Sequence, residues 1–94
     1  MEHKVKELLQ NAYERIEKGN IPQKQKTALK NNKIDRDTLA WFFLISEASL
    51  IGINTQDIIT TKIAQENIEI VNNAIKKYEE NFSSIMMKFM NGKL

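Results

Sequence analysis

The alternation of hydrophobic and polar positions predicts a helical protein built around one central helix. The run from Leu39 to Ile45 is apolar at all seven positions. On a helix of about 3.6 residues per turn these side chains point nearly all round the axis, and a helix that is apolar on every side is a buried one. We therefore expect a central helix over about residues 36–51, with Asp35 as its N-cap and Gly52 just beyond its end.

Two shorter patterns precede this run. The spacing i, i+3, i+4, i+7 predicts an amphipathic helix from about Glu2 to Lys18, ended by Gly19 and Pro22. Good helix-forming residues over Gln23–Lys30 predict a second, short helix, which Asn31-Asn32 interrupts. The first helix has its apolar face at Val5, Leu8, Leu9, Ala12, Tyr13 and Ile16.

The C-terminal part carries one long apolar stripe. Asn54 or Thr55 begins a helix there, and no Gly or Pro follows before Asn91. A continuous helix of about 36 residues would be about 54 Å long, about twice the length of the central helix, so it either breaks or projects. The break candidates are 72–73 and 81–84, where short polar side chains compete for backbone hydrogen bonds, and we expect the break near 81–84. The stripe comprises Ile59, Ile63, Ile70, Ala74, Tyr78, Phe82, Ile85 and Phe89.

Together these patterns predict an all-α fold, a small bundle of about four helices in a single domain over residues 1–94. A chain of 94 residues can bury one core, but oligomerisation would add to its stability. The absence of cysteine excludes disulfides and thiolate chemistry and fits a cytoplasmic protein. No apolar run approaches the roughly 20 residues that span a membrane, so we expect no membrane span.

One long segment of the chain carries charges of a single sign. Every charged residue from Lys18 to Lys33 is positive, and Lys24, Lys26, Lys30 and Lys33 form a candidate basic patch. The patch is either a site for an acidic partner or a phosphate, or a solvated connector. A DNA-binding helix-turn-helix is excluded, because its second helix would have to expose polar side chains where this chain has its aromatic run.

Candidate metal ligands are carboxylates. The pairs Glu14/Glu17 and Glu66/Glu69 each place two carboxylates on one helix face, an arrangement that can hold Mg²⁺ together with substrate phosphates or can form an ordinary salt-bridged surface. Glu47 lies one helical turn from apolar neighbours on both sides. It is therefore either at the rim of the core or buried with a raised pKa.

One segment resembles a known family. The stretch Trp41–Asn54, followed by Asp57 and Lys62, is similar to the second half of MazG-like nucleotide pyrophosphohydrolases, where an apolar helix ends in Gly-Ile-Asp or Gly-Ile-Asn and a helix with a lysine follows. The stretch Glu14–Asn20 is similar to the end of that family's first acidic helix. The resemblance implies Mg²⁺-dependent attack on a nucleoside triphosphate.

The family binds Mg²⁺ through the paired motifs Glu-Glu-x-x-Glu and Glu-x-x-Asp. With the chains aligned on Gly52, the second motif falls on Arg36 and Leu39, which cannot ligate a metal. The resemblance therefore carries over only Glu14 and Glu17, and we expect the fold likeness to outlast the activity.

The end of the stripe is a candidate partner-binding surface. Three of the four methionines lie in this segment, and clustered methionines recur on surfaces that adapt to partners. We expect it to form an interface with a second copy, as a homodimer, or with another protein; the alternative is that it closes the monomer core. The residues are Phe82, Ile85, Met86, Met87, Phe89 and Met90.

Two functions from different classes are consistent with these patterns. The first is a small intracellular regulatory protein that binds a protein partner without catalysis, with the size and helicity of phage- or plasmid-type inhibitors, antitoxins and immunity proteins, and with no cofactor. The second is a divergent pyrophosphohydrolase that uses Glu14, Glu17 and Glu47 with Mg²⁺. We favour the first, because one of the positions required for metal ligands holds a leucine.

Overall fold

The computed structural model describes the backbone of residues 1–91 and the side chains of residues 1–81, and residues 1–91 form six helices and no strand. The all-α prediction is confirmed. Within the described part of the chain, no helix combines the length and the hydropathy that a membrane crossing requires. The helices are α1 (Glu2–Glu17), α2 (Gln23–Lys30), α3 (Arg36–Leu50), α4 (Thr55–Ile59), α5 (Lys62–Glu66) and α6 (Ile68–Asn91).

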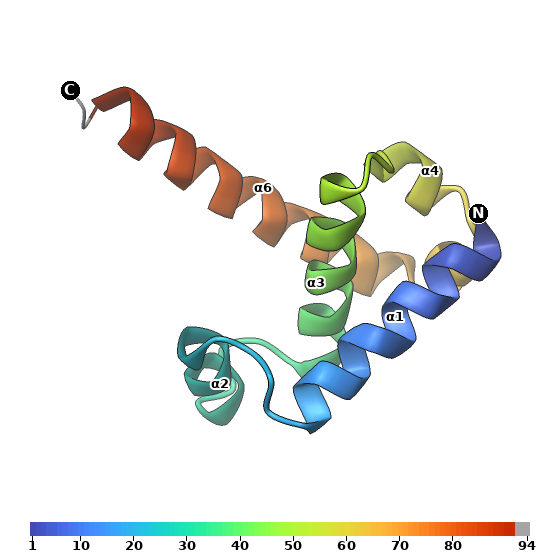
Figure 1. Ribbon diagram of the computed structural model, residues 1–94, viewed down its shortest axis with the longest axis horizontal. Coiled ribbons are helices and arrows are strands. Elements are labelled where there is room, and N and C mark those ends of the chain that lie inside the picture. The colour runs from blue at the N-terminus through green and yellow to red at the C-terminus, as the bar shows by residue number, and fades with distance from the viewer. Residues whose placement is uncertain (92–94) are drawn as a thin grey trace.

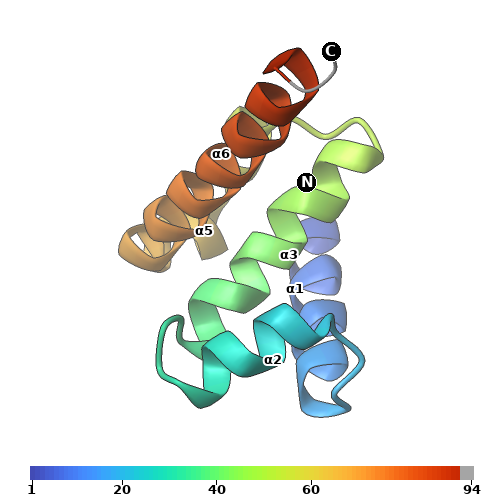
Figure 2. The same cartoon turned by 90° about the vertical axis from the view of Figure 1, so that its left-hand side faces the viewer.

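The centre of the fold is α3, as the apolar run predicts. It packs mainly against α6 and α1, and Figure 2 shows it between them. Side chains on different faces of α3 are at most 1% exposed, so other helices cover it from more than one direction. Examples are Trp41, Leu44 and Ile45. Full burial of a large apolar side chain contributes about 1.5–3 kcal/mol to the free energy of unfolding. The largest fully buried side chains are Trp41, Leu39, Leu44, Ile45, Ile58, Val5 and Val71.

The core has two parts that meet on α3. The larger one joins the first half of α1 to α3, α4, α5 and α6, and Trp41 lies within it. The smaller one, around Leu39 and Phe43, joins the second half of α1 to α3 and to the segment that contains α2. No residue of α2 is fully buried, and Leu29 is its contribution to this smaller core. The helix α2 is therefore held less firmly than the others.

Three helices end in the same way. The residues Gly19, Asn32 and Gly52 have φ values of +70°, +56° and +86°, the left-handed conformation that turns the chain out of a helix. At each end the next residue's N–H reaches back five positions, which is the Schellman pattern. The predicted stops at Gly19 and Gly52 are thus confirmed. The bonds are Asn20 N–H to Arg15 C=O (2.8 Å), Lys33 N–H to Ala28 C=O (2.8 Å) and Ile53 N–H to Ala48 C=O (2.9 Å).

The predicted break near 81–84 is wrong, because α6 runs without interruption through these positions. The stripe breaks earlier, where α4 and α5 end. The Thr61 hydroxyl donates to the Ile58 carbonyl (2.7 Å) and accepts from the Ala64 N–H (3.2 Å), which closes α4 and caps α5. Asn and Ser inside a helix cost only about 0.5 kcal/mol each, too little to break α6 without such a cap.

The first turn of α1 adds a second cap to α5. One carboxylate oxygen of Glu2 accepts the N–H of Lys62 (2.7 Å), and the other accepts the N–H of Ile63 (2.9 Å). These N–H groups have no partner inside α5, because the first turn of any helix leaves its donors free. The pKa of Glu2 is lowered below its ordinary value of 4.5, chiefly by the hydrogen bond from the Ile63 N–H. The Lys62 N–H and nearby lysine charges lower it further.

We expect Trp41→Ala to lower the free energy of unfolding by about 3–5 kcal/mol, because it removes the largest fully buried side chain of the core. Urea denaturation followed by circular dichroism measures the change. Leu50→Ala is the matched control on the same helix: Leu50 is 87% exposed, so its loss should change stability by less than about 0.5 kcal/mol. Equal midpoints for the two variants would contradict the central position of Trp41.

We expect Glu2→Gln to destabilise the protein at neutral pH and not in acid. Because the pKa of Glu2 is lowered by folding, its stabilisation is present above the ordinary value of 4.5 and is lost as the pH falls through the folded-state value. Denaturation curves at neutral pH and in acid should therefore differ between variant and wild type only at neutral pH. Glu66→Gln, at an exposed position of α5, controls for the loss of one charge. A constant difference at all pH values would contradict the charge-dependent cap.

Candidate functional site

The candidate carboxylates Glu14, Glu17 and Glu47 lie on α1 and α3, whereas Glu66 lies at the end of α5 and Glu69 in the first turn of α6. Arginines accompany two of the first three. Glu17 lies 3.6 Å from the Arg36 guanidinium, and Glu47 lies 3.9 Å from that of Arg15. The Glu47 side chain is 41% exposed, which agrees with a position at the rim of the core. Glu14 is exposed and lines, with Glu47 and Arg15, a hollow of about 340 Å³.

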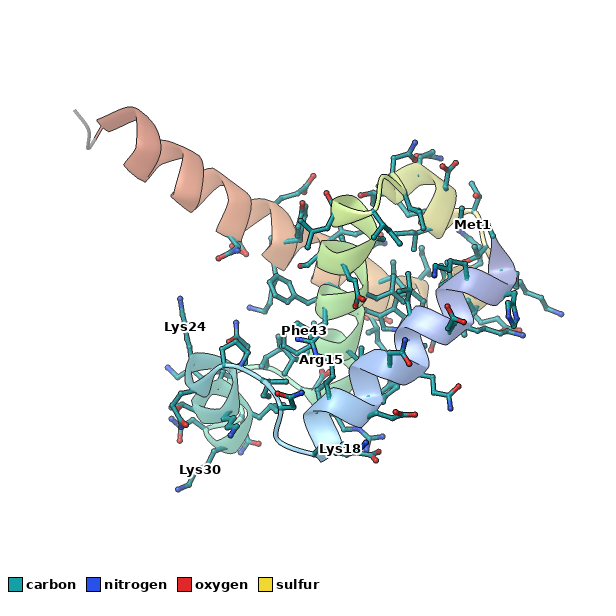
Figure 3. The ribbon with its side chains drawn as sticks, viewed as in Figure 1. Met1, Arg15, Lys18, Lys24, Lys30 and Phe43 are labelled. Atoms are coloured by element: carbon teal, nitrogen blue, oxygen red, sulfur yellow. The ribbon has the colours of Figure 1, made fainter. Side chains whose placement is uncertain are left out.

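Aromatic rings hold both arginines in place. The Cζ atom of Arg15 lies 4.9 Å from the centre of the Phe43 ring, and that of Arg36 lies 4.9 Å from the centre of the Tyr13 ring. Figure 3 shows Arg15 beside Phe43. A guanidinium over a ring face gains attraction from the ring electrons. Fixed cations thus already lie beside Glu17 and Glu47.

The positions that the MazG resemblance aligns with metal-binding acids have other roles here. Arg36 pairs with Glu17, and Leu39 is 1% exposed within the smaller core. Among the residues with described side chains, no three Asp, Glu or His residues gather as a group that could hold a metal ion. Glu17 and position 36 do lie side by side, but they form an ion pair across α1 and α3.

A tyrosine–carboxylate bond, which sequence reasoning missed, ties α1 to α3. The Tyr13 hydroxyl donates to Asp37 Oδ1 at 2.5 Å. Partial burial, followed by this bond and the Asp37 charge, raises the pKa of Tyr13 to about 12. From the local sequence, Asp37 is expected only to favour the start of the central helix by its charge. No local pattern indicates that it accepts a hydrogen bond from Tyr13, which lies 24 positions earlier. The contact stabilises the fold beside the carboxylates.

A groove crosses the other side, between α2, the start of α3, and α6. It consists of two adjoining hollows of about 470 and 380 Å³ that share Lys33, Ile34, Lys77 and Glu80. We call it the lysine groove. The first hollow is also lined by Asn32, Asp35, Thr38, Asn73 and Lys76. The second is also lined by Lys24, Gln25, Ala28, Leu39, Phe42 and Asn81.

The structure divides the predicted basic patch. Lys24 and Lys33 line the lysine groove, whereas the Lys26 side chain lies beside Gly19. Figure 3 shows Lys24 on the α6 side of α2 and Lys30 pointing away. The packing of α6 adds two lysines that sequence reasoning missed, Lys76 and Lys77. Their adjacency is visible in the sequence, but their closeness to α2 depends on tertiary packing.

One polar atom beside the groove lacks a partner. The side-chain oxygen of Gln25 is buried, and no donor among the described residues reaches it. A buried acceptor without a donor costs about 1–3 kcal/mol. The groove therefore combines lysine charge, an unsatisfied acceptor and apolar side chains in one place.

The predicted partner-binding residues Phe82, Ile85, Met86, Met87, Phe89 and Met90 lie outside the side chains that the structure describes. Their backbone belongs to α6. Their role as an interface therefore stays a prediction.

Comparisons of the chain with protein-family models, with curated protein sequences and with solved structures found no match. The resemblance to MazG-like pyrophosphohydrolases accordingly stays a prediction. The function of the chain has to be inferred from its fold and from the geometry of its surfaces.

We expect the protein to hydrolyse no nucleoside triphosphate in the presence of Mg²⁺ or Mn²⁺. The reason is that Arg36 and Leu39 stand where the resemblance to MazG-like enzymes aligns metal-binding acids, and Arg36 pairs with Glu17. Release of pyrophosphate and of phosphate, measured against a blank without protein, checks this. Turnover well above the blank that disappears in Glu14→Gln would make the pyrophosphohydrolase the better hypothesis.

Proposed function

We propose that this chain is a small non-catalytic protein that acts by binding another protein, and that the end of α6 is its contact surface. The observation that carries the proposal is the length of α6, which runs for 24 residues to Asn91. In Figure 1 its last turns lie apart from every other helix. A helix that extends beyond its own fold presents a surface to a partner.

The sequence of α6 supports this use. Its first part is buried, since Val71 and Ala74 are 0% exposed, and the Tyr78 hydroxyl donates to Ser49 near the end of α3 (3.1 Å). After Tyr78, the apolar residues of α6 keep the same spacing as before it, with alternating steps of three and four residues. Alternating steps of three and four residues are the pattern by which helices pair along a seam. The positions are Ile68, Val71, Ile75, Tyr78, Phe82, Ile85 and Phe89.

A second copy of the chain is the partner that we propose first. The α6 of a second copy has apolar residues at the same positions and can therefore pair with this row. A contiguous apolar surface left in water favours such association. A different protein would use the same surface if the chain acts as an inhibitor, antitoxin or immunity protein, whose size and helicity it shares. Binding through α6 requires no chemistry at Glu14, Glu17 or Glu47.

The alternative proposal, a divergent pyrophosphohydrolase, has one supporting observation. Glu14 and Glu47 line the same hollow, as two metal-binding carboxylates would. However, Arg15 lines that hollow as well and pairs with Glu47, so a cation is already present. The binding function is therefore the better supported of the two.

We expect the protein to be a homodimer and Ile85→Glu to be a monomer, because a charge in an apolar helix seam opposes pairing. Light scattering coupled to size-exclusion chromatography over a range of protein concentrations gives the mass. Ser84→Glu adds the same charge at the neighbouring position, outside the three-and-four spacing, and should stay dimeric. A wild-type protein that is monomeric at all concentrations would contradict self-association through α6.

A further inference from the structure

The lysine groove is a surface that the proposed α6 interface does not use. Four lysines line it, Lys24 from α2, Lys33 from the α2–α3 turn, and Lys76 and Lys77 from α6. Among the residues with described side chains, none of the four forms an ion pair with a carboxylate. Positive charges from α2 with its following turn and from α6, two regions that are far apart in the sequence, thus come together without an ion-pair partner.

Few negative charges oppose these lysines. The lining contains two carboxylates, Asp35 and Glu80. Asp35 is engaged as the N-cap of α3, where its Oδ1 accepts the Thr38 N–H at 2.7 Å. Asp35 keeps its negative charge there, so Asp35 and Glu80 together offset two of the four lysines, and the groove has a local excess of two positive charges that favours an acidic ligand.

The groove also has an apolar side. Phe42 and Ile34 are partly buried and line it, next to the fully buried Leu39. A ligand that carries only charge would leave this apolar surface in contact with water. A ligand with an apolar stripe would cover it, as amphipathic helices do when they lay their apolar face into a groove. Acidic residues beside that stripe would meet the lysines.

The arrangement of the lysines matches an elongated ligand. Lys24 belongs to one hollow and Lys76 to the other, while Lys33 and Lys77 border both. The positive charges therefore follow the length of the groove. Successive acidic residues along one side of a helix can meet charges placed in this way.

The chain's own C-terminal segment does not fit this chemistry. Residues 81–94 contain Lys88 and Lys93 and no Asp or Glu. A second copy that inserted the end of its α6 would bring positive charge to positive charge. The end of α6 from a second copy is therefore not the occupant that the charge of the groove favours.

We infer that the lysine groove binds an acidic amphipathic helix of a partner protein, with the apolar stripe of that helix on Phe42 and Ile34 and its carboxylates on the four lysines. The inference does not rest on self-association through α6. It gives the chain a second protein-binding surface with a chemistry of its own.

The test uses the full-length protein labelled with ¹⁵N and a synthetic helical peptide of about 18 residues, or five turns, with a leucine stripe flanked by glutamates. Amide chemical shifts report both where the peptide binds and how tightly. We expect the shifts of Lys33, Phe42 and Lys77 to change on titration. We expect Lys24→Glu to weaken binding about tenfold, because it removes one ion pair and adds a repulsion.

Lys30→Glu is the matched control, because it makes the same charge change in the same helix at a side chain that points away from the groove (Figure 3). Binding to this variant should change less than about twofold, as expected for a charge that is solvent-screened and distant from the peptide. The amide spectrum of each free variant also shows whether it is folded. Equal weakening by Lys24→Glu and Lys30→Glu would overturn the assignment to the groove.

Two further probes decide the chemistry of the ligand. Polyglutamate of the same length should bind more weakly than the peptide, and equal binding would overturn the role of the apolar side chains. A single-stranded oligonucleotide should also bind more weakly; tighter binding at the same residues would make the groove a nucleic-acid site and overturn the inference. The absence of shift changes in the groove at millimolar peptide would overturn it as well.

Discussion

The apolar run Leu39–Ile45 points nearly all round the axis of α3 and has to be removed from water, and this requirement sets the arrangement of the other helices. One helix covers only part of the circumference of another, so α1 and α6 pack on α3 from different directions, as Figure 2 shows. The short helices α4 and α5 contribute Ile58 and Ala64 to the same core. The remaining helix, α2, faces the middle of α6 across the lysine groove.

The weak attachment of α2 gives the molecule its groove. A helix with apolar residues over a wide face would have packed closely on α3 and α6, whereas α2 is mostly Lys and Gln and buries no residue completely. Leu29 fixes it to the smaller core, and the turn through Asn32 sets its direction. Its Lys24 is thereby held opposite Lys77 of α6, across a space lined in part by Phe42. The polar composition that is typical of a connector is therefore also what leaves the groove open.

The sequence is a good guide where the information is local. The ends of α1 and α3 follow from Gly19, Gly52 and Asp35, because left-handed backbone and side-chain caps depend on neighbouring residues. The predicted position of the break before α6 is wrong. Part of what holds α5 in place is Glu2, whose contact with Lys62 spans 60 positions and leaves no local pattern.

The candidate sites on the surface show the same difference between local and long-range information. The resemblance and the acidic spacing single out Glu17, and the apolar neighbours of Glu47 single out that residue. Only packing across α1 and α3 reveals that arginines accompany both. Half of the groove's lysines are visible as a charge run, and the other half arrive with α6. Charge that is contiguous in sequence can be predicted, while charge assembled in space cannot.

The cap that Glu2 places on α5 has a consequence for the order of events during synthesis. Donors and acceptor are separated by 60 residues, so the first turn of α1 leaves the ribosome long before the backbone that it binds. Until then, the α1 carboxylate and the start of α5 each remain in water, and closing so long a loop carries an entropic cost that only the assembled core can offset. The beginning of this chain therefore takes its final place only after much of the rest has been made.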